Sequence, residues 1–250
     1  MKLQLIRSAT IKLFFQTCTI LVDPCLAPKF GIYSYAGISK NPLVELPMPL
    51  EDILGDIDAV IVSHLHSDHF DSVARQIIKK DIPLFCQPDD EAKIRELGFT
   101  DARPVQESAI FRGVEMRRFY GQHGHGSVLE DMGIVSGFSF KAEGAPSICW
   151  LGDTVLIPAV EKRLLEEMPD IVVAHSSGAV WGSERIKIVL DEEQTVRICA
   201  LLPGSRIIAT HMDSLDHGTV TRKQLRAYAE GHSIAPEALI IPEDGEMLTL

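Results

Sequence analysis

The chain has 250 residues, of which 46% are hydrophobic and 24% charged, a balance typical of globular proteins rather than disordered or fibrous ones. Its formal net charge of −11 disfavours nucleic acid and anionic membranes as partners, since binding to a polyanion requires clustered Lys and Arg. No stretch approaches about 18 consecutive apolar residues, and the first ten residues, MKLQLIRSAT, lack a signal-peptide core. We therefore expect a cytoplasmic protein.

The number and spacing of the cysteines also favour a cytoplasmic protein. There are five, an odd number, and none forms a C-x-x-C pair, which argues against a disulfide framework and against a thiolate zinc site. We expect reduced and mostly buried thiols at Cys18, Cys25, Cys86, Cys149 and Cys199.

The first fifty residues predict a short antiparallel meander followed by a long loop. Alternating hydrophobicity over Leu3–Leu5, Ile11–Phe15 and Ile20–Val22 is typical of strands, and Asp23-Pro24 ends the third. The segment 24–49 contains five of the fourteen prolines and has no sustained periodicity. We expect it to cross the surface as a loop, and loops of this length are often functional.

Strands and helices alternate through most of the remaining chain. Its first part predicts strands at 59–62 and 84–86, a helix capped near Asp71 or Ser72, and a helix over 89–97 that Gly98 ends. Further strands are expected at 114–120, 135–140, 147–151, 171–174, 206–210 and 239–241. Further helices are expected at 159–168, 192–202 and 221–230. This order predicts an α/β fold of two mixed sheets packed face to face with helices outside.

The densest group of metal-binding residue types comes after the strand at 59–62. The segment His64-Leu65-His66-Ser67-Asp68-His69 places three imidazoles and a carboxylate within six residues. Alternate residues of an extended segment point the same way, so His64 and His66 can reach one metal ion together. A turn at Ser67 would direct Asp68 and His69 to a second point, so one loop can begin two adjacent metal sites. The alternative is a solvated, helix-capping loop.

Other candidate ligands come after the carboxyl ends of later apolar strands. Open α/β sheets commonly place ligand sites at this edge, so the side chains are consistent with one shared cleft. Nearby glycines, such as Gly121, Gly124 and Gly152, permit close backbone approach. The candidates are His123, Asp153, His175 and His211.

In their order, these motifs resemble the metallo-β-lactamase superfamily of dinuclear metallohydrolases. The resemblance includes the six-residue motif, a later His in a Gly-rich loop, Gly152-Asp153-Thr154 after a strand, and a strand ending in His211. It covers essentially the whole chain and implies an αββα sandwich in a single domain, 1–250, with the metal cleft at one edge. The branch that it resembles contains L-ascorbate-6-phosphate lactonase and uncharacterised metal-dependent hydrolases.

The resemblance also implies the ligand set. A first ion would be held by His64, His66 and a mid-chain His, and a second by Asp68, His69 and His211, with Asp153 as the bridge. Asp68 would also orient the attacking water, which is its catalytic role. Histidine and carboxylate ligands suit zinc, while manganese, iron and nickel are alternatives.

Several histidines have competing interpretations. We favour His123 over His125 as the mid-chain ligand, because Gly121-Gln122 provides a compact turn after the strand; His125 is then a rim residue that contacts substrate or a solvated loop residue. His175 either faces the cleft or is a structural histidine. His217 contacts substrate or orients a ligand. Other residues without assigned chemistry are His232, expected at the surface, Asp213 and Asp216, expected as loop acceptors or partners of ligand imidazoles, and Trp150 and Trp181, expected in the core or cleft wall.

The predicted function is hydrolysis of a small molecule, such as a lactone, ester or phosphodiester, by hydroxide that bridges two metal ions. A homo-oligomer is compatible with the sequence. A noncatalytic metal-dependent binding or sensing protein is the alternative, although every implied ligand is intact. A nuclease of the superfamily is disfavoured, because the chain is acidic and has no basic arm.

Overall fold

The computed structural model describes residues 1–250, and its strands form two large sheets. The first sheet has an antiparallel half made of the N-terminal meander and the C-terminal strand, and a parallel half that continues from β3. In spatial order its strands are β16 (Met247–Thr249), β1 (Lys2–Arg7), β2 (Thr10–Phe14), β3 (Thr19–Val22), β4 (Ala59–Val62), β5 (Leu84–Cys86) and β6 (Ala102–Pro104).

The second sheet is also mixed. Four of its strands are parallel, and the other three continue it in antiparallel fashion from β10. In spatial order its strands are β15 (Leu239–Ile240), β14 (Arg206–Thr210), β11 (Ile171–His175), β10 (Ile148–Trp150), β9 (Ser136–Lys141), β8 (Val114–Tyr120) and β7 (Ser108–Phe111).

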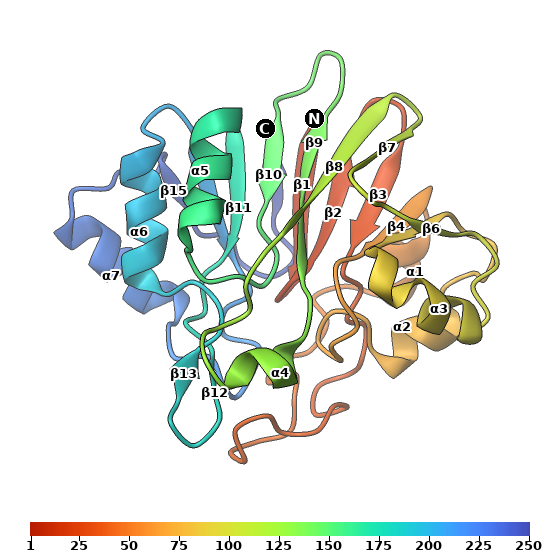
Figure 1. Cartoon of the computed structure of the whole chain (residues 1–250), viewed down its shortest axis with the longest axis horizontal. Coiled ribbons are helices and arrows are strands. Elements are labelled where there is room, and N and C mark those ends of the chain that lie inside the picture. The colour runs from red at the N-terminus through yellow and green to blue at the C-terminus, as the bar shows by residue number, and fades with distance from the viewer.

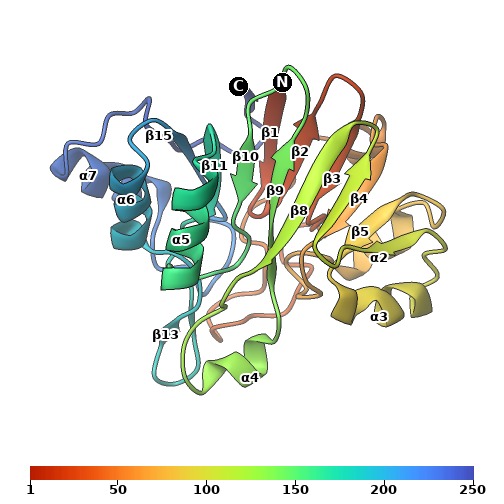
Figure 2. The same ribbon diagram turned by 45° about the horizontal axis from the view of Figure 1, so that its top comes forward.

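Helices cover the outer face of each sheet, which gives four layers (Figures 1 and 2). The first sheet packs against helices α1 (Leu50–Leu54), α2 (Ser72–Ile77) and α3 (Glu91–Glu96), the last preceded by a 3-10 turn over Pro88–Asp90. The second sheet packs against α5 (Pro158–Glu167), α6 (Glu192–Leu201) and α7 (Arg222–Gly231). The predicted αββα sandwich is therefore confirmed.

The central core lies between the two sheets, and both contribute to it. Leu5 and Ile61 come from the first sheet, and Val114, Trp150 and Val173 from the second, all fully buried. Burial of apolar surface contributes roughly 25 cal/mol per Å², so this core is the main source of the fold's stability. It holds both sheets in place, and therefore also the loops at their edges.

Local sequence signals explain where the helices begin. Asp71 accepts a hydrogen bond from Ala74 N at 2.6 Å and caps α2, and Asp191 accepts one from Gln194 N at 2.9 Å and caps α6. Thr221 and Gln224 form a capping box at the start of α7. The predicted helices near these positions are confirmed.

One end of the sandwich carries irregular structure that closes over the edge of both sheets. Here lie the loop 24–49, helix α4 (Val128–Met132) and the small hairpin of β12 (Val180–Trp181) and β13 (Ile186–Lys187). In Figure 1 this end is at the bottom, and both termini are at the top. The predicted loop is confirmed, with a single isolated bridge between Ile32 and Asn41. The two short helices α1 and α4 lie outside the predicted elements.

The five cysteines are all free and buried, as predicted. Burial raises the pKa of Cys86 and Cys149 to about 12 and that of Cys199 to about 11, which keeps these thiols protonated at neutral pH. None of the helices combines the length and the apolar character needed to span a bilayer.

Candidate metal centre and substrate pocket

The loop that carries the histidine motif is held by Asp23, the residue directly after β3. Its carboxylate accepts hydrogen bonds from Ser63 N at 2.8 Å and from Ser63 Oγ at 2.7 Å. Because Ser63 comes directly after β4, these bonds fix the chain at the point where the motif begins. From the sequence, Asp23 was expected only to end a strand. Its contact with Ser63 spans forty residues, so the local pattern does not contain it.

A first group of three imidazoles lies at this edge. The ligand atoms of His64, His66 and His123 all lie within 4.8 Å of one another. The Nδ1 of His123 donates to the carbonyl of Ile188 at 2.7 Å, so its proton is on Nδ1 and the lone pair of Nε2 faces the group. Burial lowers the pKa of His123 to about 4 and that of His64 well below its ordinary range, which keeps both rings neutral. Neutral imidazoles are the form that binds metal ions.

A second group combines carboxylates with imidazoles. Asp68 Oδ2 lies 3.5 Å from His69 Nε2 and 3.3 Å from His211 Nε2. The Nδ1 of His69 donates to Asp23 Oδ2 at 2.6 Å, so Nε2 is the atom that faces the group. Burial opposes a charge on His69, but the carboxylates of Asp153, Asp68 and Asp23 together raise its pKa well above the ordinary value. This buried, carboxylate-rich site therefore favours a positive charge.

Asp153 connects the two groups. Its Oδ2 lies 3.1 Å from His69 Nε2 and 3.3 Å from His123 Nε2, and its Oδ1 lies 3.8 Å from His211 Nε2. The preceding Gly152 has φ +64°, and a Cβ there would lie 2.7 Å from the carbonyl oxygen of Ser136. Only glycine allows this turn after β10. The turn places one carboxylate between imidazoles from both groups.

The ring nitrogens of this region test whether the residues fit a bound cation. The Nε2 atoms of His64, His175 and His211 are buried without a hydrogen-bond partner. A buried polar atom without a partner costs about 1–3 kcal/mol, and these three all belong to the groups of imidazoles and carboxylates that lie close together at this edge. The donor set of imidazole nitrogens and carboxylate oxygens suits a first-row divalent ion. The residues therefore fit a metal centre.

Of the three histidines considered as substrate contacts, His175 and His125 do not line the pocket beside the candidate ligands. His175 ends β11 with no exposed surface, and its Nδ1 lies 2.6 Å from Asp153 Oδ1. Its ring stacks on that of His211, with 4.8 Å between the centroids. His175 therefore belongs beside the metal centre and supports Asp153. His125 is exposed, its Nδ1 lies 2.9 Å from Gln122 Nε2, and it does not line the pocket beside the candidate ligands.

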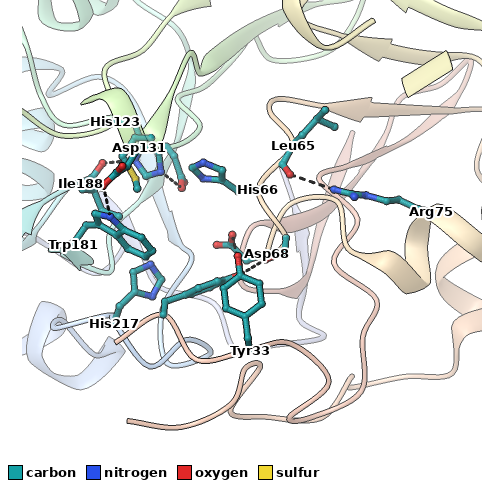
Figure 3. Close-up of a pocket in the computed structure, with 14 residues that line it drawn as sticks. Tyr33, Leu65, His66, Asp68, Arg75, His123, Asp131, Trp181, Ile188 and His217 are labelled. Carbon is teal, nitrogen blue, oxygen red and sulfur yellow. Dashed lines mark hydrogen bonds and ion pairs between the residues drawn. The ribbon is translucent and has the colours of Figure 1, made fainter. Parts of the chain in front are cut away.

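This pocket has a volume of about 390 Å³ and opens beside both ligand groups (Figure 3). Its inner end is formed by the candidate ligands His66, Asp68, His123 and Asp153. Its walls combine aromatic and aliphatic side chains with the polar residues Ser67, Arg75, Asp131 and His217, and they include residues of the loop 24–49, of α4 and of the small hairpin. The apolar and aromatic wall residues are Tyr33, Tyr35, Leu65, Met132, Trp181 and Ile188.

His217 lies in the wall of the pocket, where a residue that contacts the substrate would have to lie. It is buried, its Nδ1 has no hydrogen-bond partner, and its ring meets that of Tyr35 edge to face at 4.9 Å. The Tyr35 hydroxyl in turn lies 2.6 Å from Ser67 Oγ and donates to Asp68 Oδ1 at 3.4 Å. Tyr35 was missed from the sequence, where only the length of its loop indicated a functional segment.

We predict that Asp23→Asn lowers the affinity for zinc by about 10- to 100-fold, because the carboxylate orients His69 and fixes the start of the motif. The measurement is a competition titration against a chromophoric chelator. Asp101→Asn is the control, since Asp101 lies on the surface and pairs only with Arg103. Equal affinities in the wild type and Asp23→Asn would show that His69 does not need this support.

Comparison with known proteins places these features in a family. Residues 18–212 match the family model described as beta-lactamase superfamily domain. The UPF0173 protein YddR of Bacillus subtilis is 31% identical over 258 aligned residues, which cover the whole of both chains.

Solved structures give the same result over the whole chain. A possible metal-dependent hydrolase from Veillonella parvula is 34% identical, with a TM-score of 0.95, over 100% of this chain and 99% of its own. An isothiocyanate hydrolase from Delia radicum gut bacteria is 35% identical, with a TM-score of 0.94 and the same coverage. This chain belongs to the beta-lactamase superfamily, and it is a hydrolase of the metallo-β-lactamase fold with a candidate His and Asp metal centre.

Proposed function

We propose that the protein is a dinuclear metal-dependent hydrolase that acts on a small organic molecule. His64, His66 and His123 would hold one ion and Asp68, His69 and His211 the other, with zinc as the first choice of metal. The observation that carries the proposal is the position of Asp153, whose carboxylate oxygens lie near imidazoles of both groups. Residues of both sheets meet at this site, which supports a single functional domain over 1–250.

Divalent ions at this site would lower the pKa of water and polarise the bond under attack, so that no serine or cysteine nucleophile is needed. Asp68 is the side chain best placed to orient the attacking water and accept its proton, since it lines the pocket beside His69 and His211. The hydroxyl of Tyr35 fixes the other carboxylate oxygen of Asp68. His217, in the pocket wall, would contact the substrate.

The lining of the pocket supports a substrate with an apolar group. Six aromatic and aliphatic side chains line the pocket, and the only basic side chain besides histidine is Arg75, whose Nη2 donates to the Leu65 carbonyl at 3.2 Å. A relative that is 35% identical over the whole chain is an isothiocyanate hydrolase. Isothiocyanates are therefore the first substrates to test, and lactones come next because the motifs resemble the ascorbate-6-phosphate lactonase branch.

The charge of the chain argues against a nuclease, and turnover would distinguish an enzyme from a sensor. A nuclease would need basic side chains for a polyanionic substrate, whereas this chain has a net charge of −11. We therefore propose neither nucleic acid nor a membrane as partner, and a cytoplasmic location and a homo-oligomer stay predictions. A noncatalytic sensor would bind metal and ligand without turnover.

Turnover on a substrate panel is the experiment that tests the function. Protein loaded with zinc, and separately with manganese, is assayed on isothiocyanates, lactones, aryl esters and phosphodiesters. We expect hydrolysis of at least one small carbon electrophile, its loss on chelation, and its recovery on adding the metal back. Asp68→Asn should lose at least about 100-fold in kcat, because it removes the general base and weakens one ligand of the second ion. Metal and ligand binding without turnover on the whole panel would favour the sensor.

A further inference from the structure

The part of the loop that carries two pocket aromatics is fastened to one buried carboxylate. Asp216 belongs to the segment between His211 and α7, and it faces residues 34–41. Six donors from this stretch reach its two oxygens. They are Ser34 Oγ, Tyr35 N at 3.0 Å, Ala36 N at 3.1 Å, Ile38 N at 3.3 Å, Ser39 N at 3.3 Å and Asn41 Nδ2 at 3.0 Å.

The loop also accepts a hydrogen bond from the backbone of Asp216. Asn41 Oδ1 accepts a hydrogen bond from Asp216 N at 2.8 Å, and Asn41 Nδ2 donates to the Tyr33 carbonyl at 3.1 Å. Asn41 is fully buried and Asp216 is 8% exposed. Hydrogen bonds to an ionised carboxylate are about twice as strong as neutral ones, so this pair gives the loop one defined conformation.

Within residues 34–41, Tyr35 packs on the small cluster of Cys25, Ala27 and Ile32, while other side chains nearby are exposed. Tyr33 and Ile38 are 66% and 75% exposed, and the only backbone ladder contact is the bridge between Ile32 and Asn41. Burial opposes ionisation of Asp216, but its hydrogen bonds, first from Ser34 and Asn41, hold its pKa well below the ordinary range. The carboxylate is therefore charged at neutral pH and is the main attachment of residues 34–41.

The attached stretch forms one aromatic wall of the pocket. The rings of Tyr33 and Tyr35 meet edge to face at 5.2 Å, and Tyr35 lies 6.4 Å from the ring of Trp181 on the small hairpin. Tyr35 also packs against His217, the neighbour of Asp216 in sequence. Figure 3 shows Tyr33, Trp181 and His217 on the same side of the pocket as Asp68. Rings in this arrangement bind a flat apolar group well, since edge-to-face contacts add to the burial of surface.

We propose that Asp216 is a positioning residue that holds Tyr33 and Tyr35 opposite Trp181, and that the site therefore selects substrates that carry an aromatic group. The inference rests on the proposed hydrolase function for its kinetic consequences. The geometry itself concerns binding, because Asp216 touches neither the pocket nor a candidate metal ligand. Its loss should therefore weaken the binding of aromatic molecules more than the chemical step.

The test compares Asp216→Asn with Asp213→Asn in the zinc-loaded full-length protein. Asp213 lies three residues earlier and pairs with Arg222 on α7, so the control makes the same change of charge without touching the loop. Benzyl and methyl isothiocyanate are the two substrates. For Asp216→Asn we expect KM for the benzyl compound to rise about tenfold, while KM for the methyl compound changes by no more than about twofold. Because Tyr35 also contacts Asp68, any fall in kcat should be the same for both substrates. Asp213→Asn should match the wild type.

A second readout needs no turnover. Trp181 lines the pocket and Trp150 does not, so binding of benzyl alcohol to the zinc-loaded protein is followed through the change in the fluorescence of Trp181. Asp216→Asn should weaken this binding about tenfold and Asp213→Asn should not, even if neither isothiocyanate is hydrolysed. Absence of turnover together with this loss of binding would therefore reject the proposed substrates and still support the role of Asp216.

Ser34→Ala provides a milder variant in case Asp216→Asn is poorly folded. It removes one donor to Asp216 and leaves the backbone contacts, so we expect a change of about threefold in the same direction. The inference is overturned if folded Asp216→Asn, or Ser34→Ala in its place, binds benzyl alcohol as the wild type does. It is also overturned if KM rises equally for the benzyl and methyl substrates.

Discussion

Replacing Asp153 by asparagine is expected to lower kcat/KM by about 10³-fold or more while the protein remains folded. The oxygens of this carboxylate approach imidazoles of both ligand groups, and it is buried among them. A neutral amide cannot balance the charge of two ions, and a loss of about 4 kcal/mol of transition-state stabilisation corresponds to that factor. His66→Ala should abolish hydrolysis in the same way, by weakening the first ion.

Folding and metal content make this prediction specific. Near-UV circular dichroism should match the wild type, because the central core between the sheets contains neither side chain. Metal content should fall below that of the wild type in both variants, and Asp101→Asn, a surface change of the same type, should keep both metal and activity. An unchanged rate in Asp153→Asn or His66→Ala, with metal content verified, would remove that residue from the site.

The second large effect separates His123 from His125. His123→Ala should lower the affinity for the first ion and suppress turnover on every substrate, because Nε2 of His123 faces His64 and His66. His125→Ala is the matched control from the same glycine-rich loop, two residues away. His125 is exposed and bonded to Gln122, so its variant should keep full metal occupancy and change activity by no more than about threefold.

Zinc titration of the two variants decides between them. If His123 is the ligand, His123→Ala should bind zinc more weakly than the wild type, and His125→Ala should bind it equally well. Full occupancy in His123→Ala together with loss in His125→Ala would exchange the roles of these two residues.

The sequence predicted the part of the site that is contiguous or comes directly after a strand. His64, His66, Asp68 and His69 share one loop, and the end of β4 directs them to one edge of the sandwich. The two sheets were predictable for a similar reason, since their long buried strands have a clear hydrophobic pattern. Short strands that are only partly buried, such as β6 and β12, do not form an apolar run and were missed.

The remaining part of the site depends on contacts between distant segments. Asp23 reaches His69 across 46 residues, and Asp216 reaches Tyr35 across 181, so no local pattern contains either pair. The sequence left the place of His175 open, between the cleft and a structural role, for a related reason. A strand end shows that a residue is near the cleft, but the neighbours from other elements, here Asp153 and His211, decide whether its ring faces the pocket or the ligands.

We propose that each chain holds two metal ions around Asp153. Anomalous scattering from crystals of protein purified without chelator, measured at the absorption edges of zinc, manganese, iron and nickel, tests it most directly. We expect two peaks in each chain, one beside His64, His66 and His123 and one beside Asp68, His69 and His211, with Asp153 between them. A single peak, or none after the crystals are soaked in each metal, would contradict the dinuclear centre.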